Sequence, residues 1–277
     1  MSDLVTGLTR FVEVVSVRAK WRQLRRTVIT MERGIGRAFA VQGRMYRQGT
    51  RVLEGGRLVS LGGYALREAW TADDWLTIFD RITSETRTMF FEPIQLGSQA
   101  AMTMAAQTLI AELAVDTSFL LTNPRAVVYL QQHGYGLISQ IDAVTRGNIA
   151  TIVNNGVAEG WSYDRVAKEI SSLYSEMAVG KPQLHIDSRA HLIAVTESGN
   201  AYEAGNSIVV ADLQDAGLQM EKKWLTVEDD RVSDGCQDNQ GQGWIPFAQS
   251  FQSGHMQPLR FPGCRCTTLY RRRPTDD

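Results

Sequence analysis

Hydrophobic residues recur at helical spacing over most of the chain. In residues 4–33 they fall three or four positions apart, with arginine and lysine between them. Gly34 and Gly36 follow this run, so the spacing predicts a first helix that ends near residue 33. Pro93 is likewise expected to end a helix. Further helices are predicted over residues 71–91, 94–115, 123–133, 137–153, 162–179 and 187–216.

Other segments depart from this helical pattern. Residues 51–66 hold a Gly-Gly pair between short β-branched runs, which predicts a small hairpin. After residue 217 the period becomes alternating, so residues 222–227 predict a strand and the rest short strands and loops. The acidic stretch 228–238 lacks calcium ligands at the required positions and is expected to form a solvated turn. The pattern predicts an α+β protein, with a mostly helical body and a small α+β module at its C-terminal end.

Charge is distributed unevenly over the 277 residues. The formal net charge is −1, yet residues 1–51 carry 11 basic and 3 acidic residues. Such a basic segment suits contact with DNA phosphates, because each neutralised phosphate releases counterions. An acidic protein partner or a merely solvated face explains it equally well. The candidate contact residues are Arg22, Arg25, Arg26, Arg33 and Arg37.

The sequence argues against membrane insertion and against the common enzyme classes. Residues 93–111 are uncharged, but their glutamines, serines and threonines indicate a packed helix and not a membrane span. No targeting segment is evident, so synthesis in the cytoplasm is expected. All three cysteines lie after residue 235, which suits a reducing compartment. Nucleophile-elbow, Walker, zinc-protease and dinucleotide motifs are missing, which favours a structural or assembly role over an enzyme.

The C-terminal third contains an ordered set of informative residues. It begins with Thr-Glu on the long predicted helix, continues through tryptophan and an Asp-Arg turn to a cysteine, and closes on Pro-Gly-Cys-Arg-Cys. In this order the chain resembles the Mu F-like family of phage head-morphogenesis proteins, over roughly residues 123–270. The residues that carry the resemblance are Glu197, Trp224, Asp229, Asp230, Arg231, Cys236, Pro262, Cys264, Arg265 and Cys266.

The resemblance implies a minor capsid protein of a tailed bacteriophage. Such a protein enters the head during assembly, associates with the portal vertex and takes part in genome packaging or delivery. Expected partners are the portal protein, the major capsid or scaffold protein and packaged double-stranded DNA, with several copies per particle. The expected location is the virion head, at or near the portal vertex. The implied division is a helical region over residues 1–122, followed by a Mu F-like domain over residues 123–277, with helices to about residue 217.

The cysteines suggest a structural zinc site. Cys264 and Cys266 are expected on one face of a closing strand, with Arg265 on the other. Together with Cys236 and His255 they form a Cys3His set for one tetrahedral zinc ion. In the family that the chain resembles, some members carry cysteine at the position of Ser233, and many carry histidine at that of Phe261. Buried thiols without metal and a disulfide that includes Cys236 remain open alternatives.

Other residues of the motif have structural interpretations. Arg231 and Arg265 are expected to pair with Glu197, Asp229 or Asp230, and Trp224 to be the core aromatic of the module. Two alternative functions remain open. One is a metal-dependent nuclease or toxin-like effector built on Asp229, Asp230, Cys236 and His255. The other is a DNA-binding adaptor built on residues 10–51.

Overall fold

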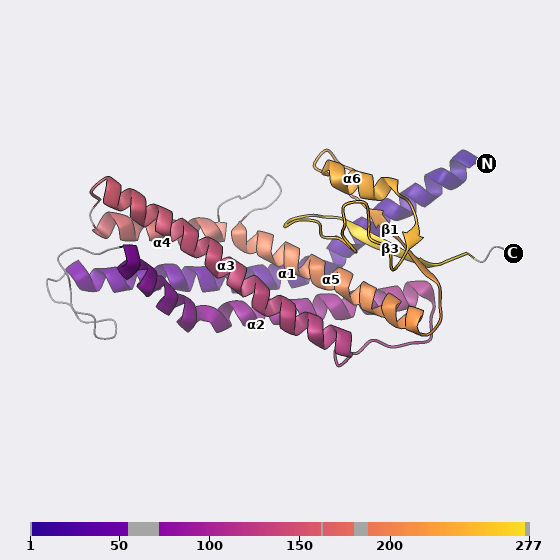
Figure 1. The fold of residues 1–277 in the computed structure, drawn as a ribbon, viewed down its shortest axis with the longest axis horizontal. Coiled ribbons are helices and arrows are strands. Elements are labelled where there is room, and N and C mark those ends of the chain that lie inside the picture. Colours follow the sequence, from indigo (N-terminus) through magenta and orange to yellow (C-terminus); the bar gives the residue numbers. More distant parts are fainter. Residues whose placement is uncertain (1, 55–71, 162, 180–187, 275–277) are drawn as a thin grey trace. The chain divides into compact units, whose positions relative to one another are not determined.

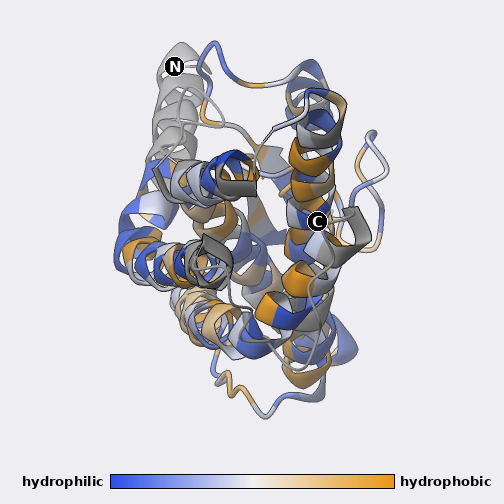
Figure 2. Cartoon of the chain, turned by 90° about the vertical axis from the view of Figure 1, so that its left-hand side faces the viewer, coloured by the Kyte–Doolittle hydropathy of each residue, from blue (hydrophilic) through white to orange (hydrophobic). Residues whose placement is uncertain are grey.

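The computed structural model describes residues 2–54, 72–161, 163–179 and 188–274. Five long helices precede a small antiparallel sheet (Figure 1). Hydrophobic and hydrophilic positions lie side by side on the same helices (Figure 2). The predicted α+β class is therefore confirmed. The elements are α1 (Ser2–Glu54), α2 (Ala72–Leu113), α3 (Pro124–Ala158), α4 (Tyr163–Val179), α5 (Arg189–Asp215), β1 (Met220–Leu225), α6 (Asp234–Gly241), β2 (Ile245–Pro246) and β3 (Thr267–Arg272).

The chain forms two compact units, each built from separate stretches of sequence. Unit 1 contains residues 1–30, 96–131 and 192–277, and unit 2 contains residues 31–95 and 132–191. The predicted division at residue 122 follows a different criterion, the extent of a family resemblance, and stays a prediction.

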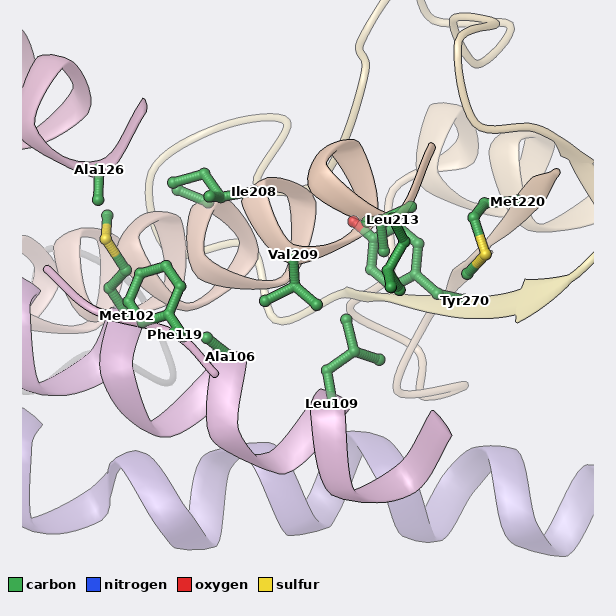
Figure 3. Close-up of a cluster of buried hydrophobic side chains, with 12 residues drawn as sticks. Met102, Ala106, Leu109, Phe119, Ala126, Ile208, Val209, Leu213, Met220 and Tyr270 are labelled. Carbon is green, nitrogen blue, oxygen red and sulfur yellow. The ribbon is translucent and has the colours of Figure 1, made fainter. Parts of the chain in front are cut away.

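Unit 1 has a hydrophobic core between helices and sheet. Side chains from α2, α5 and the sheet meet there, together with Phe119 and Ala126 (Figure 3). Gly205 of α5 lies against the backbone of Met102, where a Cβ atom would collide with the carbonyl oxygen. The glycine therefore lets α5 and α2 pack closely. The buried set is Met102, Ala106, Leu109, Phe119, Ala126, Ala204, Ile208, Val209, Val210, Leu213, Met220 and Tyr270.

The sheet has the order β2-β1-β3, and both pairings are antiparallel. Lys222 of the central strand lies opposite Ile245 on β2 and Tyr270 on β3. Trp224 lies opposite Thr268. Because side chains alternate along a strand, Lys222 and Trp224 share one face of β1, and both are fully buried. The Cys-Arg-Cys motif precedes β3 and is not part of that strand, which corrects the expected closing strand.

Unit 2 shows why the predicted helix ends at Gly34 and Pro93 are wrong. Both α1 and α2 continue through these residues, and Pro93 lies inside α2. A Cβ atom on Gly34 would lie 2.5 Å from Cβ of Pro93, so the proline occupies the space that the glycine leaves. Packing between the two helices thus offsets the backbone hydrogen bond that Pro93 cannot donate.

Several other boundaries differ from those predicted. Helix α3 is continuous where a break was expected near residue 134. Residues 51–54 of the predicted hairpin belong to α1, and its remaining residues lie outside the described part, as does residue 162, the first of the helix predicted over 162–179. The expected turn at 228–238 is wrong from Asp234 onward, because α6 buries Cys236 and Asn239 on one face. Within the described residues, no helix combines the length and apolar character needed to cross a membrane.

Candidate metal site of the C-terminal module

Three cysteine thiols meet in the interior of unit 1. Cys236 comes from the first turn of α6, and Cys264 and Cys266 come from the segment before β3. Their sulfur atoms all lie within 4.8 Å of one another, and all three residues are buried. The Sγ atoms of Cys236 and Cys264 are 4.0 Å apart, and all three thiols are free. The disulfide alternative is therefore not what the structure contains.

The thiols polarise one another. Hydrogen bonds with Cys264 and then Cys266 lower the pKa of Cys236 to about 3. Hydrogen bonds with Cys236 and Cys264 raise the pKa of Cys266, and the hydrogen bond with Cys236 raises the pKa of Cys264. The nearby Ser233 hydroxyl further lowers the pKa of Cys236, and it does not cap α6. The cluster thus favours thiolate character at Cys236, the form that binds metals.

This donor set fits a zinc ion. Zinc prefers thiolate ligands at about 2.3 Å, which places tetrahedral sulfur ligands about 3.8 Å apart. The separation of 4.0 Å between Cys236 and Cys264 is close to that value. Among the described residues, the metal-capable group consists of the three cysteines without His255, whose Nδ1 lies 3.0 Å from both the hydroxyl and the carbonyl oxygen of Ser253. The three cysteines are thus the residues able to hold a metal here.

The cluster lies in a small aromatic core. Trp224 is fully buried and packs edge-to-face on Phe251, with ring centroids 5.0 Å apart. Both belong to the same buried cluster as the three cysteines. Lys222 is also buried; its Nζ donates to the Met256 carbonyl at 2.7 Å and lies 5.0 Å from the Phe251 ring centroid. Burial lowers the pKa of Lys222 to about 8.

The acidic turn is held by one of the predicted arginines. Both terminal nitrogens of Arg265 donate to Asp229, each at 2.7 Å, and this pairing lowers the pKa of the carboxyl group. Asp229 also accepts from the backbone N–H of Arg231, whose own side chain is exposed. Asp230 is exposed as well. Across the described residues, a metal-capable cluster forms at the cysteines and not around Asp229 and Asp230.

The remaining motif residues lie at the edge of the cysteine segment. Glu197 is buried in α5, next to Thr196. The Thr196 hydroxyl accepts a hydrogen bond of 3.0 Å from the N–H of Gly263, while Pro262 is exposed. The Thr-Glu step of the motif therefore fixes the loop that leads into Cys264.

Sequence reasoning missed the contribution of α1 to this site. Lys20 is fully buried, and its Nζ donates to Glu203 at 2.6 Å and to the carbonyl oxygen of Cys266 at 2.9 Å. The indole N–H of Trp21 donates to the carbonyl oxygen of Arg265, also at 2.9 Å. Glu203 is buried on α5. A lysine within a basic stretch resembles its exposed neighbours in sequence, so no local signal marks it.

The opposite side of α1 carries the predicted basic contacts. Arg22, Arg25 and Arg26 are exposed, while Leu24 and Val28 between them are buried in unit 1. We call these three residues, together with the exposed Arg18, the arginine face. Their positions fall within about a quarter of the helix circumference at 3.6 residues per turn. Arg33 and Arg37, which belong to unit 2, are exposed as well.

A comparison with protein families agrees with this arrangement. The family model described as Phage Mu protein F like protein matches residues 147–269. Residues 147–269 are thus similar to this family. The Mu F-like segment extends from α3 into β3 and contains all three cysteines, so the resemblance inferred from the sequence motif is confirmed. Searches of curated proteins and of solved structures return no match.

Proposed function

We propose that the chain is a minor capsid protein of a tailed phage that acts in head assembly at the portal vertex. The Mu F-like match over residues 147–269 carries this proposal. The geometry agrees with a structural role, because several motif residues are used in packing or in internal bonds. Asp229 is paired with Arg265, and the three cysteines are buried.

The arginine face is the surface that we assign to the partner. It presents four exposed guanidinium groups from one helix of unit 1. Its partner is an acidic surface of the portal or scaffold protein, or the packaged DNA. These two differ in salt dependence, because DNA binding through phosphates weakens steeply as salt rises.

The test is a pull-down of the full chain with the portal protein of the same genome. We expect retention of the chain by assembled portal rings. Charge reversal of Arg22, Arg25 and Arg26 to glutamate should abolish it. The matched control reverses three exposed arginines of unit 2 and should keep binding: Arg81, Arg87 and Arg146.

Outcomes other than portal binding identify the alternatives. DNA binding with a steep salt slope, lost in the triple variant and with no portal retention, supports the DNA-binding adaptor. Nuclease activity that depends on a divalent metal overturns the structural role.

We also propose that the cysteine cluster binds one structural zinc ion through Cys236, Cys264 and Cys266. The three buried sulfurs lie within 4.8 Å of one another, and the 4.0 Å between those of Cys236 and Cys264 is close to the spacing that zinc requires. Bound zinc would supply cross-links between α6 and the segment before β3, in a module with little core of its own. Elemental analysis should find one zinc per chain, and none after Cys264→Ser with Cys266→Ser. His255→Ala should leave zinc binding unchanged, since His255 bonds to Ser253; a large loss would make it the fourth ligand.

A further inference from the structure

Two side chains of helix α1 bond to the backbone of residues 264–266, the cysteine segment. The side chains of Lys20 and Trp21 donate to the carbonyl oxygens of Cys266 and Arg265, each at 2.9 Å. One carbonyl belongs to Cys266 itself, and the other belongs to Arg265, which lies between Cys264 and Cys266. The positions of two sulfur ligands and of two acceptors for α1 are therefore set by the same short piece of backbone.

Glu203 strengthens this connection from α5. Its carboxylate accepts from Lys20 at 2.6 Å, from the Thr267 hydroxyl at 2.7 Å and from the Thr268 N–H at 3.1 Å. One buried carboxylate thus joins α1 to the two residues that follow Cys266. A buried ion pair fixes the relative position of its elements more strongly than it stabilises them, because removing either partner leaves an uncompensated charge.

Apolar contacts link the same parts. Gly199 of α5 lies close to the Trp21 ring and to Leu259, as a Cβ atom there would be 3.3 Å and 2.9 Å from their nearest atoms. Leu259 in turn packs against the buried cluster that contains the cysteines. Trp21 is therefore bonded to the cysteine segment, and its ring meets Gly199 of α5 at the same point as Leu259, a residue packed against the cysteine cluster.

From this arrangement we infer that metal binding at the cysteine cluster and docking of α1 in unit 1 are energetically coupled. The inference rests on the proposed zinc site. Zinc holds the Arg265 and Cys266 carbonyls where Lys20 and Trp21 need them, and docked α1 holds the thiols where zinc needs them. The coupling is reciprocal, as linkage requires. Because the arginine face lies on the same turns of α1 as Lys20 and Trp21, metal occupancy controls how firmly this face is presented.

The first experiment measures zinc affinity by competition with a chromophoric chelator, using the full chain. Trp21→Phe removes one hydrogen bond and retains a ring, so zinc affinity should fall about tenfold. The matched control is Trp161→Phe. Its indole N–H also makes one hydrogen bond, to Glu159 at 2.7 Å, but in unit 2. Zinc affinity of this control should equal that of the wild type.

The second experiment needs no variant. Hydrogen exchange of the wild-type chain is compared with zinc and after chelation. Exchange at residues 17–30 should slow about tenfold or more with zinc, while residues 141–153 of unit 2 should change little.

The outcomes separate this inference from the zinc proposal. Zinc bound with equal affinity by Trp21→Phe and Trp161→Phe, together with unchanged exchange at residues 17–30, overturns the coupling and leaves the zinc site standing. A wild-type chain that binds no zinc overturns both. A tenfold loss confined to Trp21→Phe, with zinc-dependent protection of α1, supports both.

Discussion

The two units use different kinds of interior. Unit 2 is helical and packs aromatic rings: Phe39 lies edge-to-face on Phe90, with centroids 5.0 Å apart, and Tyr46 stacks near Tyr174. Unit 1 also has an apolar core, but in addition it buries three thiols, the Lys20–Glu203 ion pair and the amine of Lys222. Interiors of the first kind tolerate changes that keep volume, whereas buried charges tolerate no loss of a partner.

The difference shows what the Mu F-like motif does. Most of its residues lie in unit 1, where the module has a short sheet and a six-residue buried cluster. Specific polar bonds hold the loops in place there, such as Arg265 to Asp229 and Gly263 to Thr196.

The largest effect is expected from the buried ion pair of unit 1. Glu203→Gln leaves the Lys20 charge buried without its counter-ion, and we expect a loss of about 3 kcal/mol in the free energy of unfolding. Adding Lys20→Met should recover at least half of this loss. Urea unfolding measures the change, and hydrogen exchange assigns it to unit 1.

The comparison for this prediction lies in unit 2. Asp80→Asn breaks the exposed pair with Arg146, whose atoms are 2.9 Å apart, and should cost less than about 1 kcal/mol. Equal losses for Glu203→Gln and Asp80→Asn would contradict the proposed difference between the units.

A middle-sized effect is expected where two helices of unit 2 touch. Gly34→Ala would place a Cβ atom 2.5 Å from Cβ of Pro93, so we expect a loss of about 1–3 kcal/mol. Gly147→Ala on α3 meets nothing within 4 Å and should instead stabilise the protein by about 0.5–1 kcal/mol. Thermal unfolding of the two variants should move in opposite directions. A stabilised Gly34→Ala variant would show that the close approach to Pro93 does not constrain the helices.

The same glycine shows how far the sequence allowed prediction. Periodicity located α5 within two residues at each end, because its apolar stripe is regular. Gly34 and Pro93 predict helix ends that do not occur, because each alone is a helix breaker, and only their close approach in space makes them compatible with continuous helices. The order of residues in the motif predicted that Cys236 would lie near Cys264 and Cys266. It did not predict that Lys20 is buried, since the partner of Lys20 is 183 residues away.

The smallest effect concerns pH and has opposite signs in the two units. Burial raises the pKa of Asp142 in unit 2 to about 6, although nearby Arg87 opposes the rise. The folded state then binds a proton more tightly than the unfolded state, so stability falls as pH rises from about 4 to 6. Asp142→Asn removes this loss. The variant should gain on the order of 1 kcal/mol above pH 6, after allowance for solvent screening, and almost nothing near pH 4.

Lys222 gives unit 1 the reverse dependence. Its lowered pKa of about 8 means that the folded state releases the proton first, so unit 1 gains stability as pH rises from 8 toward 10. Hydrogen exchange of the wild-type chain, measured as a function of pH and corrected for the intrinsic exchange rate, gives the change of stability with pH for both units in one sample. A common slope in residues 141–153 and 220–225 would mean that the two units unfold together, and the contrast drawn from their interiors would not extend to their stability.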